Sequence, residues 1–403
     1  MLPFLQFILA VGVIITAAKA GGYLSYRLGQ PAVAGEVLAG LLLGPSVANF
    51  LHLPLFTDES IAESVIHLSE VGVLLLMFLA GLELHLDDLA RSGRVAVLAG
   101  GFGFVLTLTL GYLLGTFNDL GPQQAIFLGL ILAPTSVGIS AQTLMELRVL
   151  RSKVGITLLG AATIDDVLGV LGVSLFSAVF LGDASGGLGN VVSLLLEMSL
   201  FLIVSSAFGF WLLPRLASLV EALPISQGLV AFTFVMVLFY AWSAEAIGHL
   251  ASVIGAFMAG LFLARSPLKA RIETGFSSIA YGVFVPIFFA NVGLSANLRQ
   301  FSVEALWLLL GMLAVVAVSK LLGPGVASQI GGTMTGRETL QLGFGMIPRG
   351  EVVLIVASVG IVEGIIGNDI FSTVVVLVVL TTLLTPPILR SLFVEPDRAG
   401  AYN

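Results

Sequence analysis

The chain has 403 residues, of which 58% are hydrophobic and only 10% are charged, and its formal net charge is −7. Soluble proteins carry roughly 25% charged residues, so this composition excludes an ordinary soluble protein and indicates a membrane protein with many spans. Because cysteine is absent, disulfides and thiol chemistry are excluded as well.

Hydropathy and its breaks predict an all-α polytopic membrane protein with about 13 transmembrane helices of roughly 20 residues each. The predicted spans are 3–25, 31–48, 64–82, 95–117, 124–145, 153–181, 189–213, 227–244, 250–265, 279–297, 304–324, 338–363 and 370–393. Short loops join them, and none of these loops is long or polar enough for a soluble domain. We therefore expect residues 1–403 to form a single transmembrane unit.

The basic residues of the loops lie mostly on one side of the predicted membrane. Alternate loops and the C-terminal tail hold Arg27, Arg91, Arg94, Arg148, Arg151, Lys153, Arg215, Arg265, Lys269, Arg271, Arg337, Arg390 and Arg398. The opposite loops hold only Arg299, together with acidic residues such as Asp119. The positive-inside rule then predicts an N-terminus outside and a C-terminus in the cytoplasm.

Two parts of the chain repeat each other in opposite orientation. Residues 33–46 align with residues 253–266 without a gap, and they share Val, Ala, Ser, two Gly and two Leu. The following spans share a Gly-Val pair and a later Phe, at 72–78 and at 282–288. The pattern predicts six spans, a linker helix at 189–213 and six spans of inverted topology. Inverted repeats are typical of secondary transporters, although channels also carry repeats.

Two predicted spans contain a proline near the middle. Span five carries Pro134 followed by Thr135 and Ser136, and span twelve carries Pro348. Such a proline removes a backbone hydrogen bond, and unwound backbone at membrane depth is tolerated only where it is buried or lines a cavity. We expect two crossing discontinuous helices whose free backbone groups and hydroxyls meet at one point. The alternative is two ordinary proline kinks.

Asp165 and Asp166 are the only charges in the apolar stretch 154–181. A charged side chain at the centre of a bilayer costs roughly 2.5–3.5 kcal/mol, so an adjacent pair indicates a function. Carboxylates bind hard cations and protons, which predicts a cation or proton pathway. Neighbouring helix positions differ by about 100°, so one carboxylate can face a cavity while the other meets a neighbouring helix.

Lys320 is the only basic residue in the predicted span 304–324 and the natural partner of one aspartate. Burial favours loss of the lysine proton, whereas an adjacent carboxylate favours keeping it. A fixed structural salt bridge and a proton-carrying lysine therefore both stay open. We favour competition, in which a cation that binds to the aspartates breaks the ion pair and releases the lysine proton.

Two further charges follow Pro348 in span twelve. Arg349 and Glu351 are two residues apart and face different sides of a helix, so each is expected to pair with other groups. We expect them to clamp the broken helix rather than to take part in transport directly. Lys19 is expected to snorkel, and Glu36, near the cytoplasmic start of span two, is expected to be partly solvated.

At these residues the chain resembles the monovalent cation:proton antiporters of the sodium/proton exchanger superfamily, particularly the bacterial NapA-like branch. The matching motifs are Gln30-Pro31 with Gly35-Glu36, Phe78–Glu83, Thr135–Gly138, Ile164–Asp166, Pro286–Phe289, Lys320–Gly323 and Pro348–Glu351. They cover nearly the whole chain. The resemblance implies that Asp166 is the principal cation and proton site and that Asp165 pairs with Lys320.

The resemblance also implies a homodimer. Residues 1–94 and 227–300 would form the dimerisation domain, and residues 95–182 and 301–393 would form a core that moves as an elevator. An Asp-Asp pair with a lysine goes with electrogenic exchange in this family. Some members carry a cytoplasmic nucleotide-binding domain that gates potassium efflux, and ligand-gated potassium efflux of that kind is not expected here.

We expect a transporter, not an enzyme, that exchanges Na⁺ (or Li⁺) for H⁺ across the bacterial plasma membrane. Na⁺ and protons would compete for Asp166 and Asp165, with Thr135 and Ser136 beside them. No cofactor and no nucleic-acid partner are expected. The alternatives are K⁺/H⁺ exchange at the same site, a cation channel, and a sodium-coupled symporter.

Overall fold

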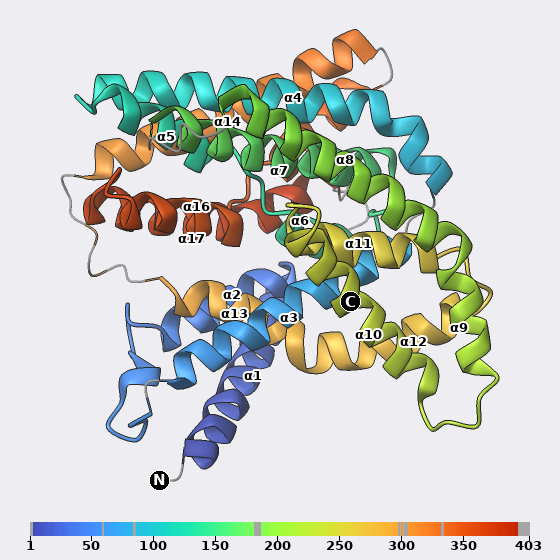
Figure 1. Ribbon diagram of the computed structural model, residues 1–403. Coiled ribbons are helices and arrows are strands. Elements are labelled where there is room, and N and C mark those ends of the chain that lie inside the picture. The colour runs from blue at the N-terminus through green and yellow to red at the C-terminus, as the bar shows by residue number, and fades with distance from the viewer. Residues whose placement is uncertain are drawn as a thin grey trace. The chain divides into compact units, whose positions relative to one another are not determined.

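The computed structural model describes residues 3–58, 60–83, 86–180, 187–296, 299, 301, 305–331 and 334–393 (Figure 1). The regular structure in these ranges is helical, and no strand occurs in them. Within the same ranges, 10 helices are long and apolar enough to cross a membrane, judged by length and composition, and three shorter apolar helices accompany them. The prediction of an all-α polytopic membrane protein is therefore confirmed.

The chain forms two compact units, each assembled from separate stretches of sequence. The first unit comprises Met1–His67, Ser92–Gly169 and Pro286–Asn403, and the second comprises Leu68–Arg91 and Val170–Val285. The first unit holds α1 (Pro3–Arg27), α2 (Ala32–Leu43), η1 (Phe50–His52), α5 (Pro122–Leu132), α6 (Val137–Glu146), α14 (Leu306–Gly331), α15 (Gly336–Gly345), α16 (Glu351–Val362) and α17 (Asn368–Phe393), with most of α4 (Leu86–Phe117), α7 (Lys153–Phe180) and α13 (Val285–Leu294). The second holds α8 (Gly187–Trp211), α9 (Leu213–Glu221), α10 (Gly228–Ala246), α11 (Ser252–Leu263), α12 (Lys269–Ile279) and η2 (Ala280–Phe284), with most of α3 (Ser60–Glu83).

In the first unit, α1 and α2 pack closely along their length. Their backbones touch where a glycine of one helix faces a glycine of the other, because a Cβ on Gly21 would overlap the carbonyl oxygen of Gly35. Helix α2 also contacts α6 and α17, which brings the N-terminal hairpin against elements from far along the chain.

Helices α2 and α11 are shorter than the spans predicted for them. Each has 12 residues, where the sequence predicted 31–48 and 250–265. Helix α2 stops at Leu43 because Gly44, which precedes a proline, adopts an extended conformation with φ −69° and ψ 177°. Twelve residues rise about 18 Å, less than the roughly 30 Å of a hydrocarbon core. The number of membrane crossings therefore stays a prediction.

Spans five and twelve are each divided into two helices. The first becomes α5 and α6, separated by residues 133–136, and the second becomes α15 and α16, separated by residues 346–350. Pro134 and Pro348 lie inside these gaps, as expected for residues that cannot donate a backbone hydrogen bond. Both predicted helix breaks are present.

The second unit is held together by aromatic and small side chains. The ring of Phe78 on α3 lies 4.8 Å from the ring of Phe276 on α12. The buried Tyr240 on α10 donates its hydroxyl to the carbonyl of Ser205 on α8 at 2.9 Å. Helix α12 continues into the π-helical turn η2, which lies just before Pro286, a residue that has no N–H to give to the preceding turn.

Candidate functional site

A buried ion pair joins α7 and α14 inside the first unit. The ammonium Nζ of Lys320 lies 2.5 Å from Oδ2 of Asp165, and both side chains are completely shielded from solvent. The methylene chain of Lys320 runs past Gly103 on α4, where a Cβ would approach it to 3.6 Å. A buried carboxylate without a partner would be costly, so this pair stabilises the charge of each member.

Asp166, the next residue of α7, is 3% exposed. It lies within electrostatic reach of Lys320, although Asp165 is the direct partner. The turn of about 100° between neighbouring helix positions explains why the two carboxylates have different surroundings. The structure thus places both aspartates and the lysine in one buried cluster.

The helix break between α5 and α6 touches this cluster through Thr135. The Thr135 hydroxyl lies 2.8 Å from Oδ2 of Asp165 and 3.2 Å from the carbonyl of Met346, which belongs to the other break. The backbone N–H of Ser136 donates to the carbonyl of Pro348 at 2.8 Å. The two breaks therefore hydrogen-bond directly to each other, and the acidic pair lies beside their junction.

Arg349 is fully buried and holds the junction together. Its Nη1 donates to the carbonyl of Pro134 at 2.7 Å and to the hydroxyl of Thr135 at 3.0 Å. Carbonyl groups at the C-terminal end of a helix carry partial negative charge, so a guanidinium is stabilising at the end of α5. This geometry is that of a clamp between the two breaks.

Helix α17 supports the clamp with two threonines that sequence reasoning missed. The backbone N–H of Arg349 donates to the hydroxyl of Thr381 at 3.1 Å, and the hydroxyl of Thr382 donates to the carbonyl of Arg349 at 3.2 Å. Both threonines are buried. The available signal was an adjacent pair of hydroxyl residues directly after the apolar run 374–380.

Two buried side-chain oxygens at the junction make no hydrogen bond within the described structure and could therefore bind a cation. Among the described side chains, the hydroxyl of Ser136 and Oδ1 of Asp165 are buried and accept or donate no hydrogen bond. Hard cations bind to oxygen ligands, and here a hydroxyl oxygen and a carboxylate oxygen without hydrogen bonds lie at the two helix breaks. The described residues contain no group of three His, Cys, Asp or Glu side chains that could hold a metal ion, so any cation here would also need hydroxyl or carbonyl ligands.

The other predicted residues lie in different places. Pro134 and Pro348 are buried within the breaks, and Glu351 begins α16, with a side chain outside the described part of the structure. Glu36 is only 6% exposed, so the expectation of a partly solvated side chain is wrong. The close packing of α1 on α2 buries Glu36, since a Cβ on Gly22 of α1 would lie 3.2 Å from Cγ of Glu36. Lys19 compensates its charge, with Nζ 3.3 Å from Oε1 of Glu36.

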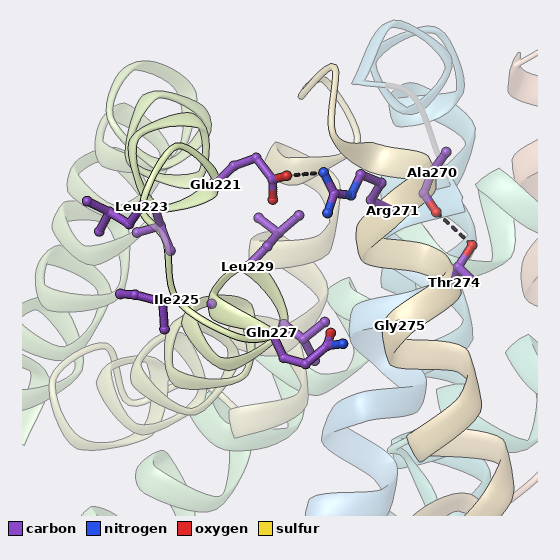
Figure 2. Close-up of a pocket in the computed structure, with 12 residues that line it drawn as sticks. Glu221, Leu223, Ile225, Gln227, Leu229, Ala270, Arg271, Thr274 and Gly275 are labelled. Carbon is purple, nitrogen blue, oxygen red and sulfur yellow. Dashed lines mark hydrogen bonds and ion pairs between the residues drawn. The ribbon is translucent and has the colours of Figure 1, made fainter.

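The second unit contains a separate cavity, which Figure 2 shows in close-up. Its volume is about 630 Å³, and it is lined by residues of α9, α10, α12 and the connection between α9 and α10. An ion pair between Glu221 and Arg271 lies at its wall. The cavity has no acidic pair and includes none of the residues predicted for ion binding.

The family described as "Sodium/hydrogen exchanger, transmembrane" matches residues 12–395. The chain belongs to the sodium/hydrogen exchanger family. This family consists of membrane transporters rather than enzymes and implies no cofactor. The resemblance of the sequence motifs to the sodium/proton exchanger superfamily is confirmed, and the assignment to the NapA-like branch stays a prediction.

Individual relatives of this exchanger match over almost their whole length. It is 33% identical over 396 residues to the Na⁺/H⁺-K⁺ antiporter GerN of Bacillus cereus, covering 98% of both chains. It is 35% identical over 386 residues to a Na⁺/H⁺ antiporter of Enterococcus hirae, covering 96% of this chain and 98% of that protein. The solved sodium proton antiporter MjNhaP1 of Methanocaldococcus jannaschii shares the fold, with a TM-score of 0.70, 17% identity, and coverage of 99% of this chain and 98% of that one.

Proposed function

We propose that this protein exchanges Na⁺, and also Li⁺, for H⁺ at the Asp165–Asp166 pair. The observation that carries the proposal is the 2.5 Å contact between Asp165 and Lys320, both fully buried, beside two helix breaks that hydrogen-bond to each other. Family membership makes cation/proton exchange the expected chemistry. A channel or a symporter is disfavoured by the names of the relatives, which are antiporters.

The charges of the cluster explain how exchange would follow. Asp165, Asp166, Lys320 and Arg349 are all buried, and when all four are ionised their charges cancel. A cation that joins this neutral cluster leaves an uncompensated positive charge, which is costly in a buried site. Loss of the Lys320 proton restores neutrality, because desolvation favours the uncharged amine once its carboxylate partner turns to the cation.

The two loaded states of the proposed cycle differ by one charge, which makes the cycle voltage-dependent. With protons bound, Asp166 is neutral and Lys320 is charged, whereas with Na⁺ bound, Asp166 is ionised and Lys320 is neutral. Passing from one state to the other releases two protons for each cation taken up. Net charge therefore crosses the membrane, and we propose electrogenic exchange.

Potassium is the second candidate for the cation. The Bacillus cereus relative, which is 33% identical, carries both Na⁺ and K⁺ in its name. Hydroxyl and carbonyl ligands bind either ion, so K⁺/H⁺ exchange would use the same residues. The name of the Enterococcus hirae relative, which is 35% identical, mentions no metal cation other than Na⁺, and this favours Na⁺ here.

We propose that the exchanger is an inverted repeat, and close helix contacts support this. A Cβ on Gly40 of α2 would overlap the carbonyl of Ala290 in α13. At the equivalent position of the predicted repeat, a Cβ on Gly260 of α11 would overlap the carbonyl of Phe78 in α3. The second helix of each predicted half thus packs against the third helix of the other half.

The reverse contacts follow the same pattern. A Cβ on Gly293 of α13 would overlap the carbonyl of Val37, and a Cβ on Gly81 of α3 would overlap the carbonyl of Phe257. Val37 and Phe257 are aligned in the predicted repeat. The close contact of α2 with α13 in the first unit therefore corresponds to the close contact of α11 with α3 in the second unit. An inverted duplication would produce this correspondence. The arrangement of 13 spans, with the N-terminus outside and the C-terminus in the cytoplasm, stays part of this proposal.

The domain division belongs to the same proposal. Residues 95–182 and 301–393 would form the moving core, and Thr135, Asp165, Lys320 and Arg349 all fall within these ranges. Residues 1–94 and 227–300 would form the static dimerisation domain of a homodimer in the bacterial plasma membrane, with 189–213 as the linker helix. The core would carry the site across by an elevator-like displacement.

Proton flux in proteoliposomes tests the proposal. With a pH gradient imposed, NaCl or LiCl should dissipate the gradient in a manner that responds to membrane voltage, and KCl should not. A variant with Asp166→Asn in the same vesicles is the control. Dissipation of the gradient by KCl would show that K⁺ is a transported cation and would favour K⁺/H⁺ exchange. A lack of response to all three salts would contradict antiport.

A further inference from the structure

Glu146, the last residue of α6, caps the beginning of α2. Its Oε2 accepts the backbone N–H of Ala32 at 2.8 Å, although 114 residues separate the two in sequence. Its Oε1 accepts Nε2 of Gln142 at 2.9 Å, which fixes the carboxylate from one turn earlier on α6. The contact therefore joins two helices that are far apart along the chain.

The cap is needed because the residue before α2 offers no side-chain acceptor. Its first N–H groups have no partner within the helix, and the preceding residue, Pro31, has no side chain that could accept them. A carboxylate at a helix N-terminus is favourable both as an acceptor and as a charge next to the positive end of the dipole. Glu146, which belongs to α6, provides both the acceptor and the negative charge for the beginning of α2.

The charged neighbours of this contact come from three further positions. Lys19 on α1 pairs with Glu36 on α2 at 3.3 Å, and Glu146 is within electrostatic reach of both. On α17, the guanidinium of Arg390 lies against Gly29 in the turn before α2, with Nη1 2.9 Å from the position that a Cβ would take. The positive charge of Lys19 thus lies near two carboxylates, those of Glu36 and Glu146. Two helices of the core range, α6 and α17, contact α2.

We propose that Glu146 is a conformational latch that holds α6 of the core range to α2 of the dimerisation range in the conformation seen here. This inference rests on the proposed elevator-like exchange. A hydrogen bond of 2.8 Å does not survive a displacement of one helix past another by several ångströms, so the latch must open once in each transport cycle. Thr135 and Ser136 lie immediately before α6 and would move with it.

Reversible cross-linking tests the latch, and the chain offers a clean background because it has no cysteine. The double variant Ala32→Cys with Glu146→Cys is bridged by a short bifunctional methanethiosulfonate reagent in proteoliposomes. Na⁺-driven proton flux should fall at least about 10-fold when the bridge forms and recover when dithiothreitol cleaves it. The matched control is Gln6→Cys with Thr57→Cys, two residues of the dimerisation range whose side chains lie 3.0 Å apart. A bridge there should leave the flux within about 2-fold.

The outcomes separate the latch from the proposed function. If the bridged Ala32/Glu146 pair exchanges as fast as its reduced form, the latch is wrong while antiport stands. If the cysteine-free wild type shows no exchange with any cation, antiport is wrong and the latch falls with it. Loss of flux in the bridged control pair as well would mean that any bridge blocks the protein, and the latch would lose its support.

A second variant asks whether the cap stabilises one conformation. Loss of a helix cap shifts an equilibrium about 2-fold to 30-fold, so Glu146→Ala should change the apparent KM for Na⁺ within that range. Glu146→Gln keeps an acceptor for the Ala32 N–H and should change it less. Equal KM values in the wild type and Glu146→Ala would overturn the latch.

Discussion

Ser136 and Pro348 connect the two broken helices directly, because the backbone N–H of Ser136 donates to the Pro348 carbonyl at 2.8 Å. Each break leaves backbone N–H and C=O groups without a hydrogen-bond partner inside a helix. Each break provides hydrogen-bond partners for some of these groups in the other break. These hydrogen bonds satisfy part of the unwound backbone from within the protein, which is what such backbone requires inside a membrane. The acidic pair of α7 lies beside this junction, and four predictions test what the arrangement does.

The first prediction concerns Asp166. Asp166→Asn removes the carboxylate that we propose binds either the cation or the proton, so exchange should be lost while the protein still folds. Na⁺-driven dissipation of a pH gradient measures the first outcome, and size-exclusion profile with thermal unfolding measures the second. Exchange at the wild-type rate would show that the binding site lies elsewhere.

The second prediction separates a proton-carrying lysine from a structural one. Lys320→Arg keeps a positive charge that can pair with Asp165, but a guanidinium does not deprotonate near neutral pH. Charge movement on solid-supported membranes should therefore disappear in Lys320→Arg and in Lys320→Ala. Only the alanine variant should also lose stability, by about 3–5 kcal/mol, because it leaves Asp165 buried without its partner. Charge movement equal to that of the wild type in Lys320→Arg would make the ion pair purely structural.

The third prediction tests the Asp165–Lys320 ion pair by changing the carboxylate. Asp165→Asn leaves the Lys320 ammonium buried without a countercharge at 2.5 Å, so the melting temperature should fall clearly. Asp119→Asn is the matched control, because Asp119 is exposed and its positive φ of 55° suits asparagine equally well. A melting temperature that is the same in Asp165→Asn and the wild type would contradict a stabilising pair.

The fourth prediction uses a hydroxyl that makes no hydrogen bond. Ser136 Oγ is buried without a partner, so Ser136→Ala should leave the free energy of unfolding nearly unchanged. If this oxygen is a cation ligand, the KM for Na⁺ should rise by about 5-fold to 150-fold, by analogy with the roughly 1–3 kcal/mol of a lost polar partner.

Ser140 provides the contrast to Ser136. Its hydroxyl donates to the carbonyl of Gly345 at 2.5 Å, so Ser140→Ala should lower stability without a specific effect on the KM. The reverse result, a stability loss in Ser136→Ala with an unchanged KM, would remove Ser136 from the site.

The sequence was informative where a single residue has a strong local effect. Pro134 and Pro348 cannot continue a helix, and both breaks occur where these prolines lie. Charges that are rare in apolar spans identified Asp165, Asp166 and Lys320, because burial of such groups needs a reason.

Contacts between distant elements could not be predicted in the same way. The support of Arg349 by Thr381 and Thr382 depends on how α17 packs, and threonine is common on helices that have no such role. The burial of Glu36 depends on Lys19 of another helix, and the cap on α2 comes from a residue 114 positions away. Helix lengths also escaped prediction, because hydropathy does not indicate that α2 ends at Leu43.

The Thr135 hydroxyl has a single hydrogen and two acceptors, Oδ2 of Asp165 at 2.8 Å and the Met346 carbonyl at 3.2 Å. It can satisfy only one of them at a time, and a rotation about one bond is enough to change from the first to the second. When Oδ2 turns to a cation, the hydrogen can swing to Met346 and leave a lone pair of the oxygen facing the ion. If a cation binds at the proposed site, the two orientations of the Thr135 hydroxyl correspond to the empty and the loaded site, and a valine of the same shape could adopt neither.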